Sequence, residues 1–159
     1  DAFLKFWFRF LFKHLSALEL LGGENAYDRL IQPELDAYFS ECFEEFCRNR
    51  LQAIYLLQER VKGRFEVGEY WKEKVVQIDV VGRRPADRWI DLGECKWGKV
   101  RSVPELVKEL DFKISKYPLP QDHGLGRRLF LHHLPQKAHP AGIKVHTLEE
   151  MLKMKEGVN

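Results

Sequence analysis

The chain has 159 residues, of which 45% are hydrophobic, and its 26 Lys and Arg against 24 Asp and Glu give a formal net charge of +2. This length suits one ordinary domain with a real core, and the hydrophobic content together with 11 Phe and 4 Trp excludes a disordered chain. The small net charge excludes a polybasic tail protein. Residues 1–79 carry 11 basic and 14 acidic side chains, whereas residues 80–159 carry 15 and 10, so we expect any site for a polyanion in the second half.

The first segment with helical spacing covers residues 3–21. Its apolar side chains are Phe3, Leu4, Trp7, Phe8, Leu11, Phe12, Leu15 and Leu18, and Gly22-Gly23 ends it. Lys5, Arg9 and Lys13 share the polar stripe of this helix. A basic amphipathic helix can lie on a membrane. Packing against a core is the more frequent use of such a helix in globular domains, and we expect it here.

The remaining elements follow in chain order. Residues 24–33 indicate a connector closed by Pro33, and a long helix is expected from Glu34 to Arg60. Beyond it, short β-branched or aromatic runs alternate with turn-like pieces. The expected elements are strands at Arg64–Trp71, Val75–Arg83 and Arg88–Trp97 with a loop at Gly82–Asp87, a helix at 103–116, a Pro- and Gly-rich loop at 117–127, strands at Arg128–His133 and Ile143–His146, and a last helix capped by Thr147.

This order predicts one compact α/β domain with an extra N-terminal helix. We divide it into an amphipathic helix and connector over residues 1–33 and the main domain over residues 34–159. Cys42, Cys47 and Cys95 form neither a disulfide framework nor a zinc pattern, and reduced thiols suit a cytoplasmic protein. No apolar run approaches the roughly 18 residues that span a bilayer. Because the chain begins at Asp1 with neither Met nor a signal-peptide pattern, we expect a piece of a longer polypeptide.

Candidate catalytic residues lie on the second and third expected strands. Alternation directs Gln77 and Asp79 to one face and Val76, Ile78 and Val80 to the other. On the next strand, Glu94 and Lys96 share a face with Ile90 and Leu92. Burying these charges costs several kcal/mol unless they are paired or bind a metal.

If these strands are neighbours, Asp79, Glu94 and Lys96 can converge. Asp79 and Glu94, with the carbonyl of Cys95, could then hold Mg²⁺ or Mn²⁺ beside a phosphate and a water. Lys96 would orient or deprotonate that water, or neutralise the phosphate. Glu44, on the border of the apolar stripe of the long helix, is the candidate third carboxylate. The alternative is a structural Glu94–Lys96 pair on a partly exposed strand.

Basic residues flank these candidates in the sequence. The expected contacts with DNA phosphates are Arg83, Arg84, Arg88, Lys99 and Arg101. A solvated charged loop is the equally acceptable interpretation of the same residues.

Four motifs carry a resemblance to known proteins. They are Asp1-Ala2-Phe3-Leu4-Lys5-Phe6-Trp7-Phe8-Arg9-Phe10, Phe43-Glu44-Glu45-Phe46-Cys47, Ile78-Asp79-Val80-Val81 and Gly93-Glu94-Cys95-Lys96-Trp97. The constellation resembles the PD-(D/E)xK nuclease superfamily. More closely, the chain is similar to a C-terminal domain, itself a family of unknown function, that follows the ATPase module of archaeal-type P-loop ATPases.

The resemblance implies a restriction-endonuclease-like αβββαβ core, that is, a mixed central sheet flanked by helices. It also implies Mg²⁺ dependence, a DNA substrate, catalytic positions at Asp79, Glu94 and Lys96, and an accessory acid at Glu44. Two positions depart from the family pattern: Glu69-Tyr70 precedes Trp71 where a Gly-Arg pair is common, and Gln77 stands where an acid often precedes Ile-Asp. The second departure weakens the case for a second metal. The resemblance also implies an upstream ATPase, which these residues do not contain, since no GxxxxGK[ST] motif occurs in them.

Three functions remain open at this point. The leading one is a metal-dependent DNA endonuclease domain of a larger ATPase. The second is a catalytically silent nuclease-fold module that binds DNA or a protein and regulates that ATPase. The third is a scaffold that docks the ATPase, or forms a homodimer, through the Phe-rich first helix.

Overall fold

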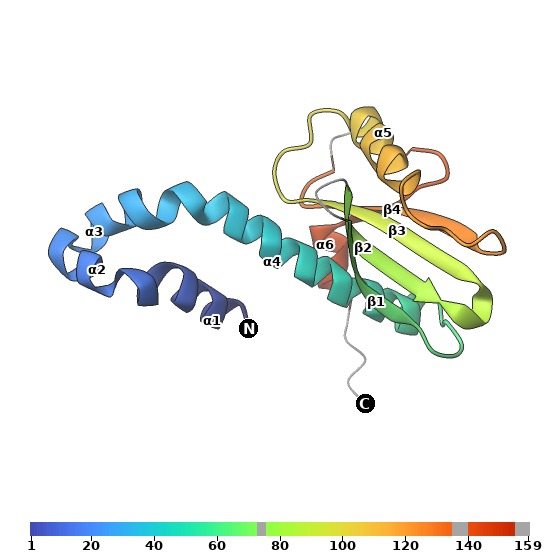
Figure 1. Cartoon of the computed structure of the whole chain (residues 1–159), viewed down its shortest axis with the longest axis horizontal. Helices are drawn as coiled ribbons and strands as arrows, with labels where there is room; N and C mark the ends of the chain where they lie inside the picture. The colour runs from blue at the N-terminus through green and yellow to red at the C-terminus, as the bar shows by residue number, and fades with distance from the viewer. Residues whose placement is uncertain (73–75, 135–139, 155–159) are drawn as a thin grey trace. The chain divides into compact units, whose positions relative to one another are not determined.

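The computed structural model describes residues 1–72, 76–134 and 140–154. The described chain separates into two compact units, residues 1–42 and residues 43–159, and the long helix α4, Gln32–Ala53, runs from the first into the second (Figure 1). Among the described residues, no helix has both the length and the apolar character that crossing a membrane requires.

The first unit is built from consecutive helical segments. They are α1 Ala2–Phe6, the π-helix η1 Trp7–Leu11, the 3₁₀-helix η2 Phe12–His14, α2 Leu15–Leu21, α3 Gly23–Ala26, the π-helix η3 Tyr27–Ile31 and the start of α4. The helix predicted over residues 3–21 is confirmed, and it ends at Gly22, whose φ of +71° suits glycine. The connector predicted over 24–33 is wrong, because these residues are helical. Pro33 lies in the first turn of α4, where its missing N–H is tolerated.

The first helix packs through a different stripe from the one expected. Phe10 is buried with Ile31 and Tyr38, and the Tyr38 hydroxyl donates to the Ala2 carbonyl at 2.5 Å. Arg9 forms ion pairs with two acids of α4, Glu34 at 3.2 Å and Glu41 at 2.8 Å. These contacts determine which side of the first helix faces α4. Contrary to our expectation, most of the predicted apolar stripe is exposed: Phe3, Leu4, Trp7, Phe8, Phe12 and Leu15.

The second unit contains a mixed sheet. Its elements are η4 Ile54–Gln58, β1 Glu66–Lys72, β2 Val76–Arg84, the 3₁₀-helix η5 Pro85–Asp87, β3 Trp89–Lys96, α5 Val103–Ile114, β4 Gly124–Leu131, β5 Lys144–Thr147 and α6 Leu148–Lys153. Within the described residues, five strands form one sheet in the order β1-β2-β3-β4-β5, antiparallel as far as β3 and parallel from β3 to β5. The predicted order of elements in this unit is confirmed, as is the Thr147 cap, which forms a capping box with Glu150.

Two predicted boundaries differ. β2 includes Gly82 and Arg83, as the predicted strand does, but it continues to Arg84, which was expected only in the loop, and Gly124 and Gly126, also expected in a loop, lie in β4. The glycines of β4 are there because a side chain at either position would collide with Trp89 or Asp91 of β3. Val75, where we expected the second strand to begin, lies outside the described residues.

The sheet is covered on both faces (Figure 1). The C-terminal part of α4, together with η4 and α6, packs on one face around Leu51, Val80 and Phe130. On the other face α5 packs around Leu110 and Leu129. Charged side chains on the central strands are therefore enclosed by protein, and their partners decide what they can do.

Candidate functional site

Asp79 lies at an irregularity in β2. Gly68 pairs with Val81 and Tyr70 with Ile78, so Glu69 faces two residues of β2, Asp79 and Val80. Such a bulge breaks the alternation of side chains. Ile78 accordingly packs with Leu92 and Tyr117, whereas Val80 packs with Phe43 and Cys47 on the opposite face. Our assignment of Ile78 and Val80 to one face was therefore wrong.

The bulge leaves Asp79 buried beside β3. Its side chain accepts a hydrogen bond from the backbone N–H of Cys95 at 2.9 Å, and its carbonyl accepts one from Arg48 of α4 at 3.0 Å. β2 and β3 are neighbours, as the convergence of Asp79 with Glu94 and Lys96 required.

Glu94 faces α5 from β3, on the same side as Ile90 and Leu92. Its side chain is 2% exposed, and each of its carboxylate oxygens contacts an ammonium group. Oε1 lies 3.1 Å from Lys96 Nζ, and Oε2 lies 2.6 Å from Lys113 Nζ. The predicted Glu94–Lys96 pair therefore exists as part of a larger group.

Lys113 was missed by sequence reasoning. It lies one turn after the buried Leu110 of α5, four residues after Glu109, and this spacing alone resembles an ordinary surface ion pair. Glu109 Oε1 lies 3.5 Å from both Lys113 Nζ and Lys96 Nζ. Only the packing of α5 on the sheet brings Lys113 to Glu94.

Glu44 reaches the same region from α4. Burial and the nearby Asp79 carboxylate raise the pKa of Glu44 to about 7, with Glu69 and Glu94 adding to the effect. Burial and Glu94 likewise raise the pKa of Asp79 to about 6, although the Cys95 N–H, Lys113 and Lys96 oppose the rise. We call the three carboxylates Glu44, Asp79 and Glu94 the acidic centre. Burial and the neighbouring carboxylates make the charged forms of Glu44 and Asp79 costly.

The acidic centre fits a hard divalent cation in its chemistry. It supplies only oxygen ligands, and Mg²⁺ is commonly held by one or two carboxylates together with waters. Among the described residues, no group of three or more His, Cys, Asp or Glu side chains is arranged to hold a metal ion. If an ion binds here, Asp79 and Glu94 of the adjacent strands β2 and β3 would hold it, with Glu44 of α4 as an additional acid.

A cavity of about 270 Å³ opens beside Lys96. It lies between the loop that follows β3 and the first turns of α5, and its lining includes Lys99, Arg101, Ser102 and Glu105. Two of the five predicted phosphate contacts, Lys99 and Arg101, thus line the same cavity as Lys96, which contacts Glu94.

The other three basic residues lie at the opposite end of the strand pair. Arg83 and Arg84 pair in register with Ile90 and Trp89, whereas Val80 pairs with Gly93 next to Glu94. Three steps along the strand separate Val80 from Arg83 and four separate it from Arg84, or roughly 10–13 Å. Arg84 is engaged by Glu59 and Asp87, Arg83 contacts the Tyr117 hydroxyl, and Arg88 forms an exposed pair with Asp122. These three residues therefore lie apart from Lys99 and Arg101 and are held by other partners.

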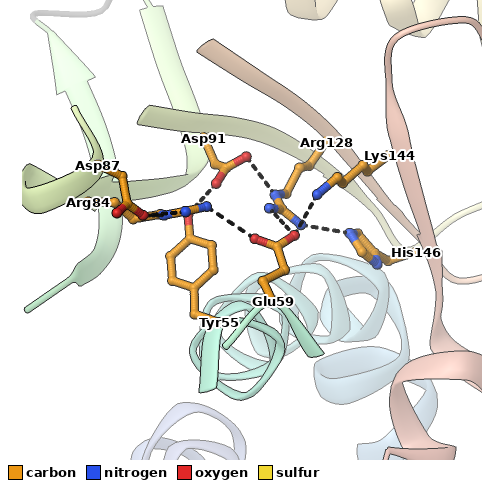
Figure 2. A network of polar contacts seen from close by, with 8 residues as sticks. All are labelled: Tyr55, Glu59, Arg84, Asp87, Asp91, Arg128, Lys144 and His146. Carbon is orange, nitrogen blue, oxygen red and sulfur yellow. Dashed lines mark hydrogen bonds and ion pairs between the residues drawn. The ribbon is translucent and has the colours of Figure 1, made fainter. Parts of the chain in front are cut away.

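A second charged cluster lies on the face of the sheet that η4 covers (Figure 2). We call it the buried ion-pair network, and its members are Tyr55, Glu59, Arg84, Asp87, Asp91, Arg128, Lys144 and His146. The Arg128 side chain, 1% exposed, donates to Asp91 at 2.8 Å and to Glu59 at 2.7 Å. The Tyr55 hydroxyl donates to the second Asp91 oxygen at 2.5 Å.

The buried polar atoms of this network all have hydrogen-bond partners within the protein. Among the described residues, no buried side-chain nitrogen or oxygen lacks a hydrogen-bond partner. Although burial opposes it, the contacts with Arg128 hold the pKa of Asp91 below its usual value. Sequence reasoning overlooked this network, although a lone Asp91 between Ile90 and Leu92 was a signal for it. We assign the network a structural role.

The fold and these clusters define a mixed α/β domain with one compensated and one partly uncompensated buried charge cluster. The chain belongs to DUF234, a family of archaeal and bacterial proteins of unknown function, whose model matches residues 7–108. The match includes Glu44, Asp79, Glu94 and Lys96. No curated protein and no solved structure matches the chain. Membership of a family of unknown function is thereby confirmed, and the nuclease assignment stays a prediction.

Proposed function

We propose that this domain is a Mg²⁺-dependent phosphodiesterase that acts on DNA. The observation that carries the proposal is the acidic centre: two buried carboxylates on adjacent strands, with Lys96 beside them and Glu44 approaching from α4. A carboxylate cluster whose members raise one another's pKa gains most from a bound divalent cation.

Each side chain has a role in the proposed reaction. The oxygen of a water forms a bond to phosphorus while the bond from phosphorus to one sugar oxygen breaks; the water loses a proton and the leaving oxygen gains one. A bound Mg²⁺ supplies charge neutralisation and a lower pKa for the water. Asp79 and Glu94 would hold the ion. Although burial opposes it, Glu94 and Glu109 raise the pKa of Lys96, which favours Lys96 as a positive charge on the phosphate over Lys96 as a base.

The substrate path is proposed to follow the cavity beside Lys96. Lys99 and Arg101 are the cations of its lining that the acidic centre does not engage, and a phosphate of the same strand could contact them. The connectivity α4, β1–β3, α5, β4 supports a restriction-endonuclease-like core. An upstream P-loop ATPase in the same polypeptide remains part of this proposal on the resemblance alone.

A second candidate is a nuclease-fold module that binds DNA or protein without cleaving. The observation that favours it is the occupation of both Glu94 oxygens by ammonium groups. In this alternative, Lys96 and Lys113 are permanent counter-ions, and the acids have a structural role only.

Cleavage with matched variants separates the two candidates. Plasmid and branched DNA are incubated with Mg²⁺ or Mn²⁺ and the wild-type chain, Asp79→Asn, Lys96→Met, or the control Asp36→Asn, which removes an exposed carboxylate of the first unit. The nuclease proposal predicts nicking by the wild type and the control, and none by the other two. If all four bind DNA equally and none nicks it, the silent module is favoured.

A further inference from the structure

Lys113 is the cation that the proposed chemistry leaves unused, although it makes the closest contact to Glu94. Its Nζ lies 2.6 Å from Glu94 Oε2, compared with 3.1 Å from Lys96 Nζ to Oε1. Its side chain is 17% exposed, against 37% for Lys96. Lys113 is thus the more enclosed partner of a carboxylate that is itself almost fully buried.

A divalent cation at Glu94 could not coexist with this arrangement. An ammonium 2.6 Å from a carboxylate oxygen occupies the place of a ligand, and it repels a second cation strongly in a site with little water. One ammonium must therefore leave Glu94 before an ion binds it.

Lys113 already contacts a second acid, Glu109, with which it can remain paired after it leaves Glu94. Glu109 stands four residues earlier on α5, with its Oε1 3.5 Å from Lys113 Nζ, and the Glu-before-Lys order is the favourable one for such a pair. The Glu109 side chain is 46% exposed, so it can follow the lysine towards water at little cost.

We propose that Lys113 is a displaceable counter-ion: it neutralises Glu94 in the metal-free protein and moves to Glu109 when a divalent cation takes Glu94. This inference rests on the proposed function, because it presumes a metal at Glu94. It makes Lys113 a competitor of the metal and Glu109 the acceptor that relieves the competition. Lys113 is a positioning residue in this scheme and contacts neither metal nor substrate.

Titration of the 159-residue chain with Mn²⁺ alone, followed by calorimetry, tests the inference. Lys113→Met keeps the length of the side chain and removes its charge, so affinity should rise on the order of tenfold. Lys113→Arg keeps the charge and should stay near wild type. Lys108→Met removes an exposed charge from the same helix, and it should change little.

Glu109→Gln is the second variant to be titrated with Mn²⁺. Without its acceptor, Lys113 stays on Glu94, so Mn²⁺ should bind more weakly than to wild type. In the Lys113→Met background the same change should have a smaller effect, a coupling that general loss of structure would not produce. Thermal melting without metal shows which variants are folded.

The outcomes separate the two proposals. If wild type binds Mn²⁺ and folded Lys113→Met binds it equally or less tightly, the displacement scheme is overturned and the proposed function stands. If neither wild type nor Lys113→Met binds Mn²⁺, the metal-dependent function fails and the scheme fails with it. Binding to Lys113→Met but not to wild type would be the strongest support for the scheme.

Discussion

The buried ion-pair network and the acidic centre both include side chains of β2 and β3, and they differ in how their charges are compensated. In the network, Arg128 lies between Asp91 and Glu59, Tyr55 donates to Asp91, and the pKa values of both acids are lowered despite burial (Figure 2). In the acidic centre, the pKa values of Asp79 and Glu44 are raised. The network stabilises the charged form of its acids, whereas in the acidic centre Asp79 and Glu44 are protonated more easily than ordinary carboxyl groups.

This difference indicates which of the two clusters would gain from binding a ligand. In a compensated network the carboxylates are already neutralised by cations of the protein, so a bound cation would add little stabilisation. An uncompensated carboxylate cluster costs stability in the free protein, and a bound cation can recover that cost. The acidic centre, whose partner Lys96 lines a cavity, is therefore the better candidate for a functional site.

The largest expected effect is on the network. Arg128→Met leaves Asp91 buried without its cation, so we expect the free energy of unfolding to fall by about 3–5 kcal/mol. The neighbouring Arg127 forms a more exposed pair with Asp111, and Arg127→Met should cost less than about 1 kcal/mol. Urea unfolding of both variants measures the contrast. Equal losses would show that the network carries no special share of the stability.

The pH dependence of the free energy of unfolding should also distinguish the buried ion-pair network from the acidic centre, with the second largest effect. Burial and the adjacent Arg128 lower the pKa of His146 to about 4. The unfolded chain therefore binds a proton near pH 6.5 that the native state refuses until about pH 4, so this residue makes stability fall as pH falls through that window. Arg128, Lys144, Glu59 and Glu150 also face His146 and set the size of the effect. His146→Gln should flatten the decline by on the order of 2 kcal/mol, and an unchanged curve would contradict the prediction.

Asp79 should act in the opposite direction. Because its native pKa is raised to about 6, the native state binds a proton more readily than the unfolded chain, and stability from this group falls as pH rises from about 4 to 6. In EDTA at pH 7, Asp79→Asn should therefore raise the free energy of unfolding by about 1–2 kcal/mol. Asn keeps an acceptor for the Cys95 N–H. A clear loss of stability would mean that Asp79 is compensated after all.

The smallest expected effect is on DNA binding. Replacing Lys99 and Arg101 by Ala should weaken binding by roughly tenfold and reduce the salt slope by about 2, since each phosphate contact releases counterions. The double variant Arg83→Ala and Arg88→Ala, at the other end of the strand pair, is the matched control and should change little. Fluorescence anisotropy at several salt concentrations measures both. The reverse ranking would move the DNA path to the far end of the sheet.

Sequence patterns were sufficient to predict the order of the elements and the residues that lie on the central strands. Alternation in Ile90–Lys96 correctly put Glu94 and Lys96 on one face, because the period of a regular strand is set by backbone geometry alone. Spacing in residues 103–116 and the Thr147 cap likewise predicted helices that exist. These are local properties, readable from neighbouring residues.

Tertiary structure decided everything that depends on partners distant in the chain. The bulge opposite Glu69 separated the faces of Ile78 and Val80, because pairing with β1 sets the register of β2 there. Packing of α5 brought Lys113 to Glu94, and η4 brought Tyr55 and Glu59 to Asp91 and Arg128. The sequence by itself determined which charges enter the sheet. Only the fold decided which of them are neutralised, because the sign and distance of the nearest charge depend on segments that meet in space and lie far apart along the chain.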